Sequence, residues 1–268
     1  MGRIETTFEQ LKRNGEVALV PFITAGDPDL ATTEAIIRTL VEAGADLIEL
    51  GFPFSDPMAD GPVIQAASER ALAAGATLAG VLEVVARVRL HTAIPIVLMG
   101  YFNPVFRYGV ERFGRDAVAS GVDGVLLVDL PPEEAAEVTA GWKPQGLSLI
   151  TLLAPTTPPA RLARLAADAE GYLYYVSMTG VTGAQAVEPA AIEAEVRHLR
   201  SLSPVPVAVG FGISTPADAA AVARFADAVV VGSALVKVIA AHAGSAALLP
   251  QVGEFVRRLK GGITGRVG

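Results

Sequence analysis

Two carboxylic acids, Glu49 and Asp60, stand on either side of a loop that follows a short apolar run. Glu49 lies within that run, LIEL, where apolar neighbours disfavour the charged form of a carboxyl group. Asp60 closes the loop after it, GFPFSDPMADG. Two carboxyl groups in surroundings of different polarity can divide acid–base chemistry. The drier one moves protons, and the wetter one stays ionised beside developing positive charge.

Both acids also have structural interpretations. Glu49 could be a buried glutamate that is satisfied by backbone groups or by a basic partner. Asp60, like Asp56 in the same loop, could organise a turn or cap a helix that begins near Pro62. We prefer the turn interpretation for Asp56, and we keep both interpretations open for Glu49 and Asp60.

Glycine-containing loops follow three other apolar runs, in the segments SMTGVTGAQ, VAVGFGIS and VVVGSA. Glycine lets the backbone approach an anion closely, and backbone N–H groups beside a helix N-terminus bind phosphate. The first segment is long enough to close over a ligand as a lid. A tight turn explains any one of these loops alone, but together they predict a phosphate site. Its candidate residues are Thr182, Gly183, Gly210, Phe211, Gly212, Gly232 and Ser233.

Three of the few aromatic residues, Phe22, Tyr101 and Tyr174, fall in or next to other apolar runs. If those runs end at a common site, the three rings suit a flat apolar ligand. Taken singly, each ring is more typical of ordinary core packing.

These residues need elements to position them, and the chain alternates short apolar runs with stretches of helical periodicity. The runs are apolar on successive residues, which is typical of parallel strands buried on both faces. Helix signals lie between them, such as Thr32 or Thr33 as a cap before a helix that stops at Gly44, and Thr215 followed by Pro216. The expected strands are residues 17–23, 46–50, 94–99, 124–129, 147–152, 172–176, 205–210 and 228–232.

Eight strand–helix units without a composition break favour one closed (β/α)8 barrel, the TIM barrel, over an open doubly wound sheet. We expect a single domain over residues 1–268, with an extra N-terminal helix over residues 1–14 and a flexible tail over residues 261–268. The loops after the second and sixth strands are long, over residues 51–63 and 177–188. In such a barrel the loops after the strands form the catalytic face.

Composition excludes several classes of function. Of 268 residues, 51% are hydrophobic, which is enough for a large core, and the net charge of −7 argues against nucleic acid as a partner. The chain has no cysteine, hence no disulfide and no thiolate zinc site, which fits the cytoplasm. Its three histidines, His91, His198 and His242, lack metal-ligand spacing, and no apolar run is long enough to cross a membrane. We expect no metal.

Taken together, the motifs PFITAGDP, LIELGFPFSDPMADGPVIQ, LMGYFNPV, DLPPEE, SMTGVTG, VGFGIS and VGSA strongly resemble the tryptophan synthase alpha subunit. The match spans nearly the whole chain, and the motifs occur in the family's order. The resemblance implies a barrel lyase of tryptophan biosynthesis. Its reaction is the retro-aldol cleavage of indole-3-glycerol phosphate to indole and glyceraldehyde 3-phosphate.

The resemblance also implies roles for the residues above. Glu49 and Asp60 become the catalytic pair, Glu49 shuttling protons and Asp60 accepting a hydrogen bond from the indole N–H. Phe22, Tyr101 and Tyr174 match positions around the indole. The glycines and Ser233 match the phosphate-binding segments, and Thr182 matches the lid residue that closes onto the aspartate.

The resemblance implies no cofactor in this chain. Pyridoxal phosphate is expected in a partner, the tryptophan synthase beta subunit, within an alpha2beta2 heterotetramer. The loop with Pro53 and Asp56, the segment around Asn103 and Pro104, and the DLPPEE motif resemble the face that meets the partner. Two alternatives stay open: another phosphate-binding TIM-barrel isomerase or lyase, and a barrel retained mainly as a regulatory or binding subunit.

Overall fold

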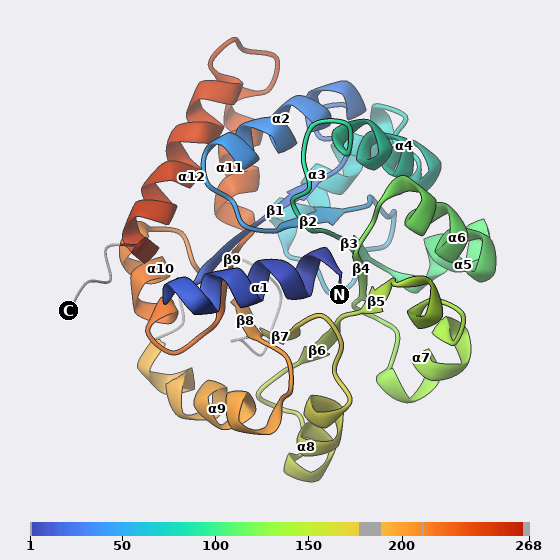
Figure 1. Ribbon diagram of the computed structural model, residues 1–268. Coiled ribbons are helices and arrows are strands. Elements are labelled where there is room, and N and C mark those ends of the chain that lie inside the picture. The colour runs from blue at the N-terminus through green and yellow to red at the C-terminus, as the bar shows by residue number, and fades with distance from the viewer. Residues whose placement is uncertain (1, 177–188, 211, 265–268) are drawn as a thin grey trace.

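The structure is a computed structural model that describes residues 2–176, 189–210 and 212–264. Its strands form one parallel sheet in the order β5-β4-β3-β2-β1-β9-β8-β7-β6 (Figure 1). The strands are β1 (Ala18–Thr24), β2 (Ile48–Gly51), β3 (Ile96–Gly100), β4 (Gly124–Leu127), β5 (Ser148–Leu149), β6 (Thr151–Leu153), β7 (Leu173–Val176), β8 (Val207–Gly210) and β9 (Ala228–Val231). Every expected strand is present, with bounds shifted by one or two residues.

The fifth expected strand, residues 147–152, forms two short strands and closes the barrel. Ser148 in β5 pairs with Gly124 in β4, whereas Thr151 in β6 pairs with Leu173 in β7. Between them the Ile150 N–H still donates to the β4 carbonyl of Val125, at 2.8 Å. One short stretch therefore joins the two ends of the sheet, and the architecture is the expected TIM barrel.

Helices cover the outside of the sheet, and Figure 1 shows them as a ring around it. Their apolar faces pack against the outward-facing strand residues, as the alternation of the sequence predicts. The helices are α1 (Arg3–Asn14), α2 (Leu30–Glu42), α3 (Pro62–Ala73), α4 (Leu78–Val88), α5 (Phe102–Tyr108), α6 (Val110–Ser120), α7 (Pro132–Thr139), α8 (Pro159–Ala167), α9 (Pro189–Leu202), α10 (Pro216–Ala223), α11 (Ser233–His242) and α12 (Leu248–Thr264), with a 3-10 turn η1 (Lys143–Gln145).

Two helix starts test the cap predictions. The predicted Thr32 or Thr33 cap is wrong, because the N-cap of α2 is Asp29, one turn earlier. The Asp29 carboxylate accepts from the Thr32 N–H at 2.7 Å. An ionised cap is favoured there by the positive end of the helix. The predicted start of α10 is confirmed, since Thr215 and Asp218 form a reciprocal capping box.

The predicted flexible tail from Gly261 is wrong for its first residues. Helix α12 continues through Gly261 and Gly262 to Thr264, because its apolar stripe carries on to Ile263, which is only 2% exposed. Gly262 also permits close packing, since a Cβ there would lie 2.5 Å from the carbonyl oxygen of Pro216. Residues 265–268 lie outside the described residues.

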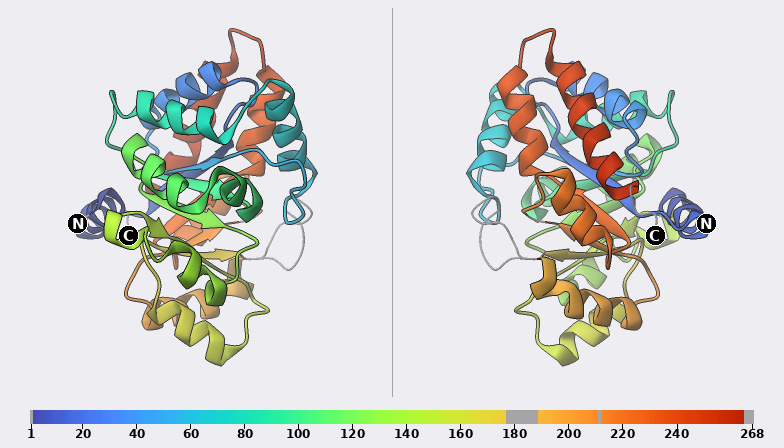
Figure 2. Two further views of the ribbon diagram at one scale, coloured as in Figure 1. Left: turned by 90° about the vertical axis from the view of Figure 1, so that its right-hand side faces the viewer. Right: turned by 90° about the vertical axis from the view of Figure 1, so that its left-hand side faces the viewer.

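The expected N-terminal helix is confirmed as α1, which lies across the end of the barrel where the strands begin (Figures 1 and 2). Its apolar side, Ile4, Phe8 and Leu11, is buried against the barrel interior. Figure 2 shows that α1 and the long loop before α3 project from opposite ends of the molecule. Helix α1 therefore does not cover the loop end.

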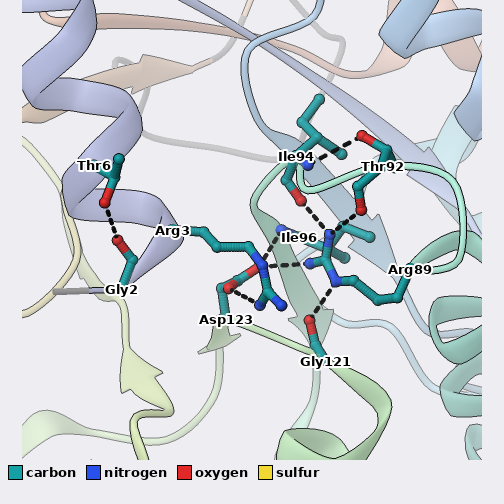
Figure 3. Close-up of polar contacts among 9 residues, drawn as sticks. All are labelled: Gly2, Arg3, Thr6, Arg89, Thr92, Ile94, Ile96, Gly121 and Asp123. Carbon is teal, nitrogen blue, oxygen red and sulfur yellow. Dashed lines mark hydrogen bonds and ion pairs between the residues drawn. The ribbon is translucent and has the colours of Figure 1, made fainter.

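An ionic cluster around the buried Asp123 connects α1 to the barrel (Figure 3). Asp123, just before β4, accepts from Arg3 of α1 at 2.8 Å and from Arg89 at 2.6 Å. Its carboxylate also accepts from the Ile96 N–H at 2.8 Å, and Arg89 donates to the carbonyl of Gly121 at 2.7 Å. Asp123 thus fixes the starts of β3 and β4 and the position of α1.

Within the described residues, no single helix is long and apolar enough to cross a membrane. Only α3 and α4 together reach the length and composition for a span, and they are bent by 93° relative to each other.

Candidate active site

Glu49 points into the barrel near the carboxyl end of β2, next to Phe22 of β1 and Val97 of β3 in the sheet register. Its side chain is fully buried. The Tyr172 hydroxyl donates to Oε1 at 2.7 Å, while Oε2 has no partner among the described residues. Burial raises the pKa of the Glu49 carboxyl to about 8, against a smaller lowering by Tyr172. At neutral pH Glu49 is therefore mostly protonated.

Tyr172 is a site residue that the sequence analysis did not recognise. It precedes β7 and lies in the inner core, where its ring centroid is 6.1 Å from that of Phe8 on α1. Strand alternation could have found it, because Tyr172 lies two residues before Tyr174 and so shares its inward face. What the sequence could not show is that this face points at Glu49.

Asp60 lies at the end of the loop over residues 52–61, partly buried beside Tyr101. Burial raises the pKa of Asp60 to about 6, and a hydrogen bond with the Tyr101 hydroxyl lowers it in part. The Ala59 N–H donates to the same hydroxyl at 3.0 Å, and Gln65 of α3 donates to the Asp60 carbonyl at 2.8 Å. Tyr101 and Gln65 thus hold the loop that presents Asp60.

The cap interpretation of these aspartates is wrong, because the N-cap of α3 is Gly61 and no side chain caps it. Asp56 instead organises its turn, as expected. Its carboxylate accepts from the Ser55 hydroxyl at 2.5 Å, and its carbonyl accepts from the Met58 N–H at 2.9 Å.

A small cavity of about 20 Å³ lies between the strand ends and the loop that carries Asp60. Phe22 and Tyr101, two of the expected aromatic residues, line it together with Asp60. The Phe54 ring lies beside Tyr101, with centroids 5.3 Å apart. The lining is otherwise mostly apolar: Thr24, Gly51, Phe52, Ile64, Ser68, Met99, Gly100 and Val128.

Tyr174, the third expected aromatic residue, is buried in β7. Burial raises the pKa of its hydroxyl well above the usual value, and the charges of Glu49 and Asp60 raise it further. The ring needs Gly210 as its neighbour on β8, because a Cβ at Gly210 would lie 2.1 Å from the Tyr174 hydroxyl. Gly210 therefore makes room for an aromatic ring. The sequence suggests another reason for this glycine, namely the close approach of an anion.

Two of the loops that the sequence predicts to bind an anion are at least partly described. Gly212 has φ +73°, a conformation that favours glycine. Gly232 caps α11 without a side-chain hydrogen bond, and Ser233 begins that helix, so its first N–H groups face the barrel end. A Cβ at Gly232 would lie 3.5 Å from Phe22, which places this loop next to the cavity. Thr182, Gly183 and Phe211 lie outside the described residues.

Among the described residues, no group of three or more acidic or histidine side chains could hold a metal ion. The described site offers carboxyl groups, aromatic hydroxyls and backbone N–H groups. This set can transfer protons and bind an anion.

Comparison with known proteins identifies the family of this chain. The family model described as tryptophan synthase alpha chain matches residues 8–263. The tryptophan synthase alpha chain of Citrifermentans bemidjiense is 57% identical over 98% of each chain. That of Geobacter sulfurreducens is 57% identical over 97% of this chain and 98% of its own.

Solved structures agree with these relatives. The tryptophan synthase subunit alpha of Legionella pneumophila has a TM-score of 0.92 at 43% identity, with 99% of each chain covered. A structure of Mycobacterium tuberculosis tryptophan synthase has a TM-score of 0.90 at 37% identity, covering 100% of this chain and 99% of that one. Fold, family model and relatives agree over nearly the whole length, and the chain belongs to the tryptophan synthase alpha chain family.

Proposed function

We propose that this chain, a lyase by family, cleaves indole-3-glycerol phosphate into indole and glyceraldehyde 3-phosphate, with Glu49 and Asp60 as its catalytic carboxyl groups. The observation that carries the proposal is the state of Glu49. It is a fully buried carboxyl group at a strand end, with a pKa near 8 and with one oxygen that has no partner among the described residues. Such a group is a proton donor at neutral pH.

The proton transfers balance with Glu49 as the only carrier. Protonated Glu49 donates to the indole carbon that holds the glycerol side chain. The ring nitrogen becomes positive, and the Asp60 carboxylate accepts a stronger hydrogen bond from its N–H, which stabilises the transition state selectively. The Glu49 carboxylate then takes the proton of the adjacent side-chain hydroxyl. The carbon–carbon bond breaks, its electrons return to the ring, and Glu49 is protonated again.

The remaining candidate residues bind the substrate. Phe22, Tyr101 and Tyr174 form the walls for the indole. The N–H groups around Gly212 and Gly232, with the Ser233 hydroxyl, bind the phosphate at the N-terminus of α11. Thr182, Gly183 and Phe211 belong to the same proposal through the family motif alone.

The direct test is to incubate the chain with indole-3-glycerol phosphate, alone and with a beta subunit, and to follow indole release. We expect slow release alone and faster release with the partner. Glu49→Gln keeps the shape of the side chain, so it should retain substrate binding and lose cleavage. Turnover at the wild-type rate in this variant would refute the role of Glu49, and no release in any mixture would favour a binding subunit.

The alternatives have less support. Another phosphate-binding isomerase or lyase would explain the anion loops but not the family match over residues 8–263. A regulatory barrel has no use for a buried carboxyl group with a raised pKa, which is a cost to stability.

An alpha chain implies a beta subunit as its partner. We propose that an alpha2beta2 heterotetramer forms, that the beta subunit carries the pyridoxal phosphate, and that both act in the cytoplasm. The rim formed by the Asp60 loop and helix α5 fits such a partner, because Met58 in the loop is 80% exposed and Phe106 on α5 is 63% exposed. Asp129, in the DLPPEE motif, joins this rim by accepting from the Phe102 N–H at 2.7 Å.

A further inference from the structure

Thr24 ends β1 beside the candidate active site, and its hydroxyl raises a question that the proposed reaction does not answer. The side chain is 3% exposed, and Oγ1 has no hydrogen-bond partner among the described residues. Proteins retain few buried polar atoms without a partner, and each requires an explanation. Proton transfer explains the free oxygen of Glu49. Nothing in that reaction uses Thr24.

The position of Thr24 points to the ligand. Thr24 pairs with Gly51 in the register of β1 and β2, and its side chain lines the same cavity as Asp60. Ser68 of α3, 5% exposed, lines this cavity as well. Apart from Tyr101, which binds Asp60, these two residues bring the only hydroxyl groups among the described lining residues. The cavity lining therefore carries two hydroxyl groups besides the carboxyl group of Asp60.

We propose that Thr24, together with Ser68, is a specificity determinant for the substituent on carbon 7 of the indole ring. This inference rests on the proposed function. Asp60 binds the ring N–H, and carbon 7 is the benzo-ring position next to that N–H. A ring held by Asp60 therefore places a substituent on carbon 7 close to the cavity that Asp60 and Thr24 both line.

The chemistry of the substituent then decides its fit. A hydroxyl group on carbon 7 supplies the partner that Thr24 Oγ1 lacks. A methyl group of nearly the same size leaves that oxygen unpaired. A site that contains a buried polar group discriminates against a ligand that cannot bond to it. The chain should accept the hydroxyl derivative better than the methyl derivative.

The experiment compares cleavage of indole-3-glycerol phosphate and of its 7-hydroxy and 7-methyl derivatives by the full chain. The readout is the kcat/KM of the hydroxy substrate divided by that of the methyl substrate. Thr24→Val keeps the shape but removes the hydroxyl, and we expect this ratio to fall about tenfold, the effect of one hydrogen bond. Thr24→Ser keeps a hydroxyl and should hold the ratio within about twofold of wild type.

Two further variants keep the test decisive. Ser68→Ala should also lower this ratio of kcat/KM values. It replaces Thr24→Val as the test if Thr24→Val does not fold. Thr139→Val, on α7 outside the cavity, should leave the ratio unchanged. An unchanged ratio in both Thr24→Val and Ser68→Ala overturns this inference while the unsubstituted substrate is still cleaved. If the wild-type chain cleaves no substrate with or without a beta subunit, the proposed function fails and this inference fails with it.

Discussion

Glu49 and Asp60 change protonation over different ranges of pH, because they are buried to different degrees and have different partners. The proposed cleavage needs Glu49 protonated and Asp60 ionised. Since the pKa of Asp60 is about 6 and that of Glu49 about 8, kcat/KM should rise with pH through 6 and fall above 8. Steady-state kinetics between pH 5 and 10 measure this profile. A rate that keeps rising through pH 8 would contradict the role of Glu49 as the first proton donor.

The same pKa makes stability depend on pH. Glu49 has a raised pKa in the folded chain, so its contribution to stability is complete below its ordinary value of 4.5 and is lost as pH rises to about 8. Glu49→Gln removes this loss. The variant should be more stable than wild type by about 3 kcal/mol at pH 7, with a smaller difference at pH 5.

Urea unfolding at a series of pH values measures this difference. Glu9→Gln is the matched control, because Glu9 is an exposed partner of Arg13 on α1. This variant keeps Glu49, so its stability should follow the same pH dependence as that of wild type. A difference for Glu49→Gln that does not grow over this range would mean that the folded carboxyl group has an ordinary pKa.

At the scale of elements, the backbone conformation of the predicted phosphate loops should affect substrate binding. Gly212 has φ +73°, and Gly146 at the end of η1 has φ +83°. Valine strains the backbone at both positions, but only Gly212 lies in a predicted phosphate loop. Gly212→Val should therefore raise KM more than it lowers kcat, whereas Gly146→Val should lower stability and leave KM unchanged. Steady-state kinetics and thermal unfolding of both variants test this, and an unchanged KM in Gly212→Val would exclude the loop from the phosphate site.

Periodicity was sufficient to predict the strand order along the chain and the barrel, because each apolar run must be buried and each helix must cover it. It could not predict that residues 147–152 form two strands, since that depends on pairing with both β4 and β7. Nor could it choose Asp29 over Thr32 as a cap, because all the candidates lie within one turn. The glycines at the end of α12 are helical only because Ile263 is buried.

The candidate site, too, could be predicted only in part from the sequence. Glu49 could be predicted because a carboxyl group within an apolar strand end is unusual. Its hydrogen bond with Tyr172 could not, because the two residues are 123 positions apart in the sequence. Thr24 carries no sequence signal of its own, since an unpartnered hydroxyl is a property of the folded cavity.

For the whole molecule, the Asp123 cluster should matter more through Arg89 than through Arg3. The Arg89 side chain is 10% exposed, whereas that of Arg3 is 44% exposed. Arg89→Met leaves a buried carboxylate without its main partner and should cost about 3 kcal/mol. Arg3→Met breaks a solvated pair and should cost less than about 1 kcal/mol. Denaturant unfolding of both variants distinguishes them, and equal losses would show that Arg3 anchors α1 as strongly as Arg89 anchors the strands.

The closure of the barrel at Ile150 has a consequence for how the protein meets other copies of itself. A closed sheet has no free edge strand that another chain could extend, so ordered aggregation by strand addition requires the barrel to open first. The seam, which consists of β5 and β6, is the weakest place for that opening. These strands have only two and three residues. Amide protons along this seam should exchange with solvent before those of β1, which has seven residues and a fully buried face on either side. Earlier exchange in β1 would show that the barrel does not open first between β5 and β6.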